Sequence, residues 1–192
     1  MKKAGVIIAA LLCIGVICGA FFFAKQKAES SQNRDAELTE VQKLITKNID
    51  DNYPPTPREV VKLYNRIITA YYKEDYTIDE LSQLADQTLK LFDDELLAIN
   101  DKESYFMALK ADIDDYARRE RYIAQSSVCD SRDVLTKTID GDEIAYVTSS
   151  YFVREGTNYA KTYHMYVLRQ DGEGKWKILV FYQIEGDSSE DD

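Results

Sequence analysis

Glycine and proline are scarce in this chain of 192 residues, and both are unevenly placed. No glycine occurs between Gly19 and Gly141, and the three prolines all lie within residues 54–57. Glycine-rich loops that hold phosphate groups are therefore excluded over that long stretch. Because glycine and proline interrupt helices, the same stretch favours several helices. The last third contains no proline that would remove a hydrogen-bond donor from a strand.

Histidine and cysteine are too few for most kinds of catalytic or metal site. His164 is the single histidine, and of the three cysteines Cys13 and Cys18 lie inside a long apolar run. Cys129 therefore has no partner outside that run for a disulfide, and a zinc ligand set cannot be assembled. No serine has a histidine at a recognisable spacing, and the acidic clusters lack the glycine and spacing of a calcium loop. The sequence therefore predicts no cofactor and no enzyme activity.

Basic residues are outnumbered, 24 against 34 acidic residues, which gives a formal net charge of −10. No cluster of lysine and arginine interleaved with aromatic residues is evident, and such clusters supply the affinity for phosphate backbones. Nucleic acid is therefore excluded as a partner. Residues 187–192 are mostly acidic and are expected to form a disordered tail.

The one long hydrophobic run covers residues 4–24, which are 21 residues without a charge, with lysines on both sides. At about 1.5 Å per residue, a helix of this length spans the roughly 30 Å hydrocarbon core of a bilayer. A cleaved signal peptide is the alternative, but its apolar region usually has about 7–15 residues. We expect a retained single-pass anchor, residues 1–24, in the cell membrane, with a soluble domain outside the cytoplasm. The lipid bilayer is then a partner through residues 4–24.

Residues 25–55 follow as a polar linker that includes a short helix within residues 36–49. Thr56 and Pro57 then give the clearest helix start of the chain, because threonine caps helices and proline fits their first turn. The following helix carries an apolar stripe at spacings of three and four. Its polar residues, among them Asn65, are expected on the opposite, solvent face. Three further helical segments are expected to begin at the capping box of Thr77 and Glu80, at Asp93 and at Lys102, the last reaching Arg121.

Glycines return in the last third, between runs rich in valine, isoleucine, threonine, tyrosine and phenylalanine. This placement indicates hairpin turns, since glycine accepts the positive φ that tight turns require. The runs exceed the usual strand of about 5–6 residues, which predicts a curved and bulged sheet. The chain therefore predicts an α+β fold in which about three helices pack on a curved four-stranded antiparallel sheet, within a domain of residues 56–186. The expected strands are Tyr122–Ile139, broken near Asp130–Asp133, then Glu143–Arg154, Tyr159–Gln170 and Lys175–Ile184.

Two resemblances to known families rest on particular segments. Residues 174–179 (GKWKIL), a tight turn into a strand, resemble the last strand of nuclear transport factor 2-like domains. That resemblance implies about three helices in the hollow of a cone-shaped sheet, with a pocket that relatives such as ketosteroid isomerase and scytalone dehydratase use for acid–base chemistry. The whole chain, with YPPTPREVV at residues 53–61 and DELL at residues 94–97, also resembles an uncharacterised family of membrane-anchored proteins of Gram-positive gut bacteria. The second resemblance implies no activity.

Tyrosine is abundant, with fourteen copies, and it suits a pocket or a protein interface because it joins a large apolar area to a polar handle. Strand alternation places His164 on the face of Tyr166 and places Tyr163 on the other face. Asp112 is a further candidate, on a helix. No position matches a catalytic motif, so no catalytic residue is predicted. The candidate pocket or interface residues are Tyr146, Tyr163, Tyr166, Trp176 and Tyr182.

Two functions stay open at this point. The favoured one is a membrane-anchored extracytoplasmic domain that mediates protein contacts, as a homodimer through the sheet or with another envelope protein, because both sheet faces carry large residues. The alternative is a small-molecule-binding or enzymatic domain, which requires a cavity of roughly a few hundred Å³ lined by tyrosines and Trp176. A space filled by Tyr64, Tyr71 and Phe106 would remove the alternative.

Overall fold

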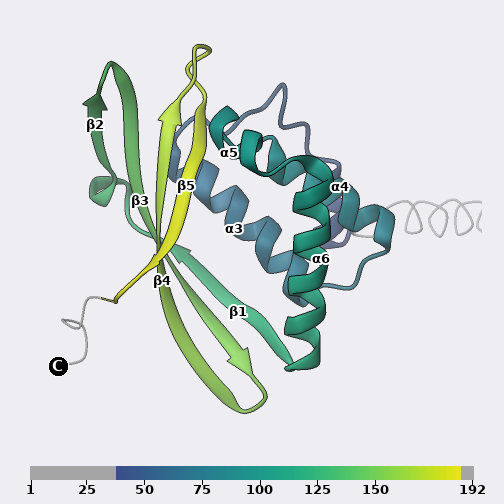
Figure 1. The fold of residues 1–192 in the computed structure, drawn as a ribbon. Helices are drawn as coiled ribbons and strands as arrows, with labels where there is room; N and C mark the ends of the chain where they lie inside the picture. Colours follow the sequence, from purple (N-terminus) through teal and green to yellow (C-terminus); the bar gives the residue numbers. More distant parts are fainter. Residues whose placement is uncertain (1–37, 187–192) are drawn as a thin grey trace, which may run out of the picture. The chain divides into compact units, whose positions relative to one another are not determined.

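A computed structural model of the protein describes residues 38–186 (Figure 1). The expected anchor at residues 4–24, the first part of the expected linker and the acidic tail at residues 187–192 lie outside the described residues. The chain divides into two units, residues 1–39 and 40–192, and the fold below is that of the described part of the second unit. Within residues 38–186, no helix has the length and apolar character needed to cross a bilayer.

The described residues contain five helices rather than about three, because the short segments predicted within residues 36–49 and at 93–99 also form helices. The predicted starts are confirmed. Thr56 accepts a hydrogen bond from the backbone of the first turn, and Thr77 and Glu80 make both bonds of a capping box. The helices are α2 (Glu40–Ile45), α3 (Pro57–Lys73), α4 (Ile78–Leu89), α5 (Asp94–Ile99) and α6 (Lys102–Arg118).

The last helix ends earlier than predicted. α6 stops at Arg118, and Glu120 has a φ of 51°. This left-handed backbone cannot continue a right-handed helix, so the chain turns there. A strand begins at Arg121, where the helix was expected to end, and the Arg121 guanidinium pairs with Glu155 at 2.5 Å across that strand and its neighbour.

The sheet has five strands rather than four, because the first expected strand is divided in two. The 3₁₀-helix Ser131–Asp133 interrupts it where the break was predicted, and the strands on either side both pair with β3. The pairings are all antiparallel, in the order β1-β3-β4-β5, with β2 beside the first part of β3. The strands are β1 (Arg121–Val128), β2 (Leu135–Ile139), β3 (Asp142–Glu155), β4 (Asn158–Gln170) and β5 (Trp176–Ile184).

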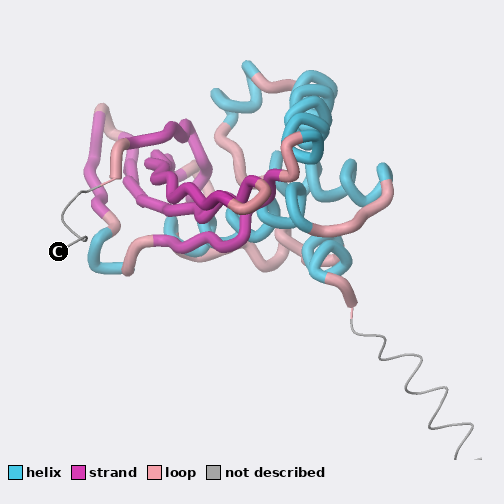
Figure 2. Tube along the Cα trace, turned by 90° about the horizontal axis from the view of Figure 1, so that it is seen from below, coloured by secondary structure: helices cyan, strands magenta, loops and turns pink. Residues whose placement is uncertain are grey.

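Two irregularities in pairing accompany the predicted curvature of the sheet. One shifts the β1–β3 register between Ile123 and Gln125, and the other shifts the β4–β5 register between Val167 and Leu168. Bulges of this kind increase local twist and bend a strand. Figures 1 and 2 show the result, a bent sheet with helices α2–α6 on its hollow side. None of these helices lies on the opposite, convex side.

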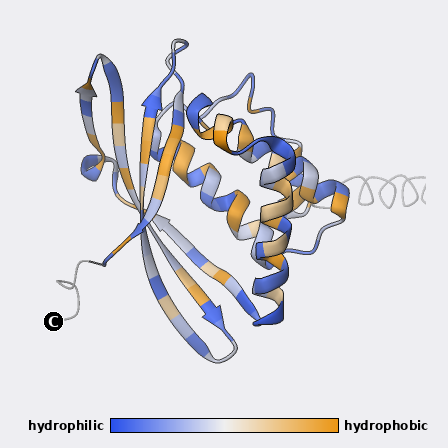
Figure 3. Cartoon of the chain, viewed as in Figure 1, coloured by the Kyte–Doolittle hydropathy of each residue, from blue (hydrophilic) through white to orange (hydrophobic). Residues whose placement is uncertain are grey.

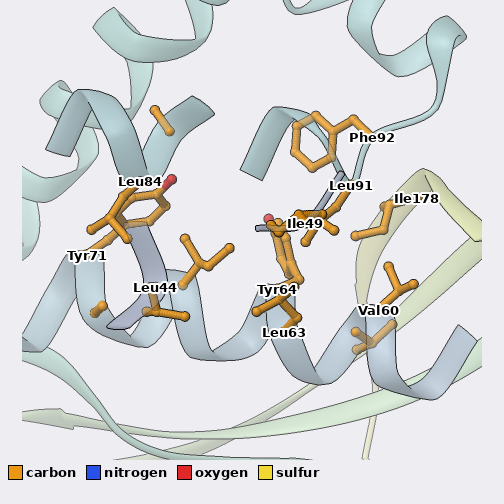
Figure 4. Packing of buried hydrophobic residues seen from close by; sticks show 14 of the residues in the cluster. Leu44, Ile49, Val60, Leu63, Tyr64, Tyr71, Leu84, Leu91, Phe92 and Ile178 are labelled. Carbon is orange, nitrogen blue, oxygen red and sulfur yellow. The ribbon is translucent and has the colours of Figure 1, made fainter. Parts of the chain in front are cut away.

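Helix α3 lies between the sheet and the remaining helices, and it organises the core. Figure 4 shows side chains of α2, α3, α4 and β5 directed toward one another, with Leu44, Tyr71, Leu84 and Ile178 among them. Figure 3 shows apolar bands along both the strands and the helices that face them. The predicted apolar stripe of α3 is therefore the core face of this helix, as its spacing indicated. Two members of the stripe, Ile68 and Tyr72, are only partly buried, because a pocket lies beside them.

Candidate functional site

A pocket of about 170 Å³ lies between α3, α6 and the hollow face of the sheet. Aromatic rings form most of its wall and pack against one another, with ring centroids 4.2 Å apart for Tyr72 and Tyr116 and 5.5 Å apart for Tyr64 and Tyr166. Rings held in such contacts cannot turn freely into the open space. The lining residues are Tyr64, Ile68 and Tyr72 from α3, Tyr116 from α6, Ile123 from β1, Tyr151 and Val153 from β3, Thr162, His164 and Tyr166 from β4, and Phe181 from β5.

Wider hollows occur on the surface, but they lack converging buried groups. One of about 510 Å³ lies between the segment that precedes α3 and α3 itself, and Glu59, Lys62 and Arg66 line it with exposed charged side chains. Such side chains are satisfied by water and need no ligand. The smaller aromatic pocket is therefore the better candidate site.

A buried chain of hydrogen bonds runs from α3 into the wall of the pocket. Asn65 donates from Nδ2 to Ser149 Oγ at 2.7 Å, and Ser149 donates from Oγ to the carbonyl of Ser127 at 2.9 Å. The Tyr151 hydroxyl donates to Asn65 Oδ1, and the hydroxyl oxygens of Tyr151 and Tyr166 lie 2.5 Å apart. The four side chains are all buried. This chain fixes how the two tyrosine rings face the pocket.

His164 forms the wall beside this chain. Its ring meets the ring of Tyr151 edge to face, with centroids 5.1 Å apart, and its Nδ1 is buried without a hydrogen-bond partner among the described residues. Burial lowers the pKa of His164, so its imidazole is neutral at pH 7. Ser149 lies opposite His164 in the β3–β4 register, but the Ser149 hydroxyl proton goes to the carbonyl of Ser127. This pair is therefore not an activated nucleophile with its base.

The wall of the pocket is uncharged. Its lining includes no lysine, arginine, aspartate or glutamate. Burial raises the pKa of Tyr151 to about 12 and raises the pKa values of Tyr64 and Tyr166 well above the ordinary value. Burial, together with a hydrogen bond to Asp112, also raises the pKa of Tyr72. These tyrosines are neutral at physiological pH. In the part of the chain that the structure describes, no group of three or more His, Cys, Asp or Glu could hold a metal ion.

Of the five candidate pocket or interface residues, only Tyr166 lines the pocket. His164, the further candidate on the same strand face, lines it as well. Tyr146, Tyr163 and Tyr182 belong to the convex side, because they alternate along their strands with the residues that face the helices. Trp176 packs against the hydrophobic core and does not line the pocket.

The polar half of the site was not predicted from the sequence. Asn65 was expected on the solvent face of α3, which is wrong, since its exposed fraction is 2%. It lies four residues after Val61 and three before Ile68, so helical spacing alone places it on the apolar face. The prediction of a solvent-facing position rested on the polarity of the Asn65 side chain. Tyr151 also had a usable signal, because it alternates with the buried Val147 and Ser149 on β3.

A second surface of interest is the convex side of the sheet. Lys161 lies 4.8 Å from the ring centroid of Tyr163 and 5.5 Å from that of Phe152, so cationic and aromatic side chains alternate near the β3–β4 turn. Large apolar side chains are exposed across the rest of this side, on four strands. We call the following set the convex sheet surface: Leu135, Ile139, Phe152, Tyr159, Val180 and Tyr182.

Comparison with known proteins adds a family but no activity. Residues 1–181 match the sequence profile of a family described as a domain of unknown function, DUF6715. None of the curated proteins matches the chain.

Proposed function

The chain belongs to the DUF6715 family, and we propose that its residues 40–186 form a domain that binds a small molecule in the aromatic pocket. The open pocket carries this proposal, although at about 170 Å³ it is smaller than the expected cavity and Trp176 does not line it. Tyr64, Tyr72 and Tyr116 are large enough to fill about 170 Å³, yet they pack against neighbouring rings and leave the space free. Protein interiors are otherwise close-packed, so an aromatic hollow beside a buried polar chain favours a ligand.

The fold supports the same function. Helices on the hollow side of a curved antiparallel sheet are the arrangement that the resemblance to nuclear transport factor 2-like domains implies. We therefore assign the domain to that superfamily as part of this proposal. A pocket between helices and sheet is common there. Binding is favoured over catalysis, because the Ser149 hydroxyl is engaged with a carbonyl rather than with His164.

We also propose that residues 4–24 hold the domain at the outer side of a cell membrane. The support is the uncharged run of 21 residues, which matches the thickness of a bilayer. Protease added to intact cells should digest residues 38–186, and the protein should stay in the membrane fraction after an alkaline wash. Release of the protein by that wash, or protection from protease, would contradict this placement.

Ligand binding can be tested by filling the pocket. The full chain in detergent should show saturable binding to members of a library of small ring compounds, followed by ligand-observed NMR. Thr162→Phe places a ring in the pocket and should abolish this binding, whereas Val180→Phe on the convex sheet surface should leave it unchanged. The proposal fails if no compound binds, or if Thr162→Phe binds as the unchanged protein does.

A second candidate function is protein contact through the convex sheet surface. The observation in its favour is the exposure of Val180 (42%) and Tyr182 (49%) on the side of the sheet that helices α2–α6 do not cover. Apolar patches of this kind mark contact surfaces. If two copies pair through this surface, sedimentation should show a dimer that Tyr182→Lys converts to a monomer. A strict monomer at high concentration would exclude the homodimer and leave a different envelope protein as the partner.

A further inference from the structure

The hydrogen-bond chain beside the pocket has a fixed direction, and one obligate acceptor sets it. The carbonyl of Ser127 can only accept, so the Ser149 hydroxyl donates its single proton there. Ser149 Oγ must then accept from Asn65, which fixes the amide so that Nδ2 faces Ser149. Asn65 Oδ1 therefore faces Tyr151 and accepts the Tyr151 proton. The short contact between Tyr151 and Tyr166 is left with one donor, the Tyr166 hydroxyl.

This direction decides what the pocket offers to a ligand. The Tyr151 hydroxyl donates its hydrogen bond to Asn65, and the Tyr166 hydroxyl donates its hydrogen bond to Tyr151. Neither hydroxyl has a proton left to donate. The lone pairs of Tyr166 are the free end of the chain, in a residue that lines the pocket. The chain therefore presents an acceptor to a ligand and no donor.

His164 adds a second acceptor on the same wall. Burial lowers the pKa of His164, so the ring is neutral and carries one N–H. Nothing among the described residues accepts a proton from the buried Nδ1. A buried N–H without an acceptor is rarer in proteins than an under-used acceptor, so the proton belongs on Nε2. Nδ1 is then a buried lone pair without a donor among the described residues.

The charges around the pocket exclude ionised ligands. A carboxylate would lose its water shell and meet no cation in the lining, whose hydrogen-bond donors are all neutral. A cation would meet no carboxylate in the lining, since Asp112 is exposed and accepts from Tyr72 outside it.

We propose that the pocket binds a neutral, one- or two-ring molecule that donates a hydrogen bond to the Tyr166 hydroxyl oxygen or to His164 Nδ1. Phenols and indoles have this chemistry. The volume of about 170 Å³ lies below the roughly 300 Å³ at which drug-sized sites begin, which fits a ligand of one or two rings. Stacked and edge-on tyrosines match planar rings. This inference rests on the proposed function and specifies its ligand class.

The test uses the full chain in detergent and four probes of similar size: 4-methylphenol, its methyl ether, 4-methylbenzoate and 4-methylbenzylammonium. The phenol and the ether share the ring, and only the phenol can donate. Calorimetry or ligand-observed NMR should show the phenol binding about tenfold tighter than the ether, the difference one buried hydrogen bond makes. Both ions should bind more weakly than the phenol.

His164→Phe keeps a ring in the wall and removes the Nδ1 acceptor. It should lower the affinity for the phenol and leave that for the ether unchanged, a ratio that partial unfolding does not alter. Tyr166→Phe should also reduce this ratio. Tyr163→Phe, which changes the neighbouring residue on the convex side, should have no effect.

The outcomes separate the two proposals. Three results would overturn the proposal that the ligand is a neutral hydrogen-bond donor, while a small-molecule pocket would stand. They are equal binding of phenol and ether, a phenol-to-ether affinity ratio that is unchanged in both His164→Phe and Tyr166→Phe, and tighter binding of either ion than of the phenol. No binding of any of the four probes would also overturn the donor class. The proposed function itself fails only if the wider library of ring compounds likewise finds no ligand.

Discussion

Arg169 on β4 holds the carboxylate of Asp93 with two hydrogen bonds, from Nε to Oδ2 at 3.0 Å and from Nη2 to Oδ1 at 2.5 Å. The same Asp93 caps α5 through its side chain, and its backbone N–H donates to the carbonyl of Ile178 on β5 at 2.9 Å. One residue thus joins two strands to the start of a helix. The segment between α4 and α5 is fixed to the sheet by this arrangement.

The Arg169–Asp93 pair should stabilise the fold more than the surface pairs do. Arg169→Met leaves the buried Asp93 carboxylate without its cation, and we expect a loss of roughly 2–3 kcal/mol, somewhat less than for a fully buried pair. Urea unfolding followed by circular dichroism measures this loss. Arg66→Met, which removes the exposed pair with Glu40, is the matched control and should cost less than about 1 kcal/mol. Equal losses in the two variants would contradict the prediction.

The buried chain should show coupling between its members. Asn65→Leu and Tyr151→Phe each leave a buried polar group without a partner, and each should cost roughly 1–3 kcal/mol. The double variant removes both partners of one hydrogen bond, so it should be more stable than the sum of the single losses by about 1 kcal/mol or more. Tyr151→Phe combined with Thr77→Ala, at a distant site, should be additive. Additivity within the chain itself would show that Asn65 and Tyr151 do not interact.

Alkaline pH should unfold the domain through its buried tyrosines. Burial raises the pKa values of Tyr64, Tyr71 and Tyr166 well above 10 in the folded state. Above pH 10 the unfolded chain loses these protons while the folded chain keeps them, so stability falls as pH rises. Each such tyrosine contributes up to about 1.4 kcal/mol per pH unit. Phenolate absorbance should therefore rise together with loss of circular dichroism. Complete ionisation near pH 10 with the fold intact would be the opposite result.

The capping box at the start of α4 should contribute measurably to the free energy of unfolding. Thr77 accepts from the backbone of Glu80 at 3.2 Å, and the Glu80 carboxylate accepts from the backbone of Thr77 at 2.8 Å. Thr77→Ala should lower the free energy of unfolding by about 1 kcal/mol, because a first-turn N–H loses its acceptor. Thr77→Ser keeps the hydroxyl and should retain most of that energy. If Thr77→Ser and Thr77→Ala lower the free energy of unfolding equally, the loss is not caused by removal of the side-chain cap.

Gln87 should hold the C-terminus of α2 in place. Its Nε2 donates to the carbonyls of Leu44, Ile45 and Lys47, at 3.2, 3.0 and 2.8 Å. Gln87→Met keeps the length of the side chain and removes this donor, so hydrogen exchange of residues 40–49 should accelerate at least tenfold while β3 is unchanged. Gln83→Met, on the exposed side of α4, is the control. Uniform acceleration across the domain would point to global destabilisation instead.

Short-range features were predicted well from the sequence because neighbouring residues decide them. The caps at Thr56 and Thr77 use side chains that bond within three residues, and the break near Asp130–Asp133 lies where the polar residues gather. The glycine turns follow the same logic, with Gly141 at φ 97° in the β2–β3 turn. The number of strands was off by one because either strand flanking that break could pair with β3, which local pattern cannot decide.

What the sequence by itself determined was the class of fold, with helices first and an antiparallel sheet after them, and the side of each strand that a residue occupies, as for His164 and Tyr166. Tertiary structure alone decided which groups satisfy the buried amide of Asn65, since its partners Ser149 and Tyr151 lie 84 and 86 residues further along the chain. It also decided that a pocket stays open, because an open space depends on how side chains from six separate elements meet. The physical reason is that helix and strand preferences arise from the nearest few residues, whereas a hydrogen bond or hollow between distant segments exists only once the whole domain is packed.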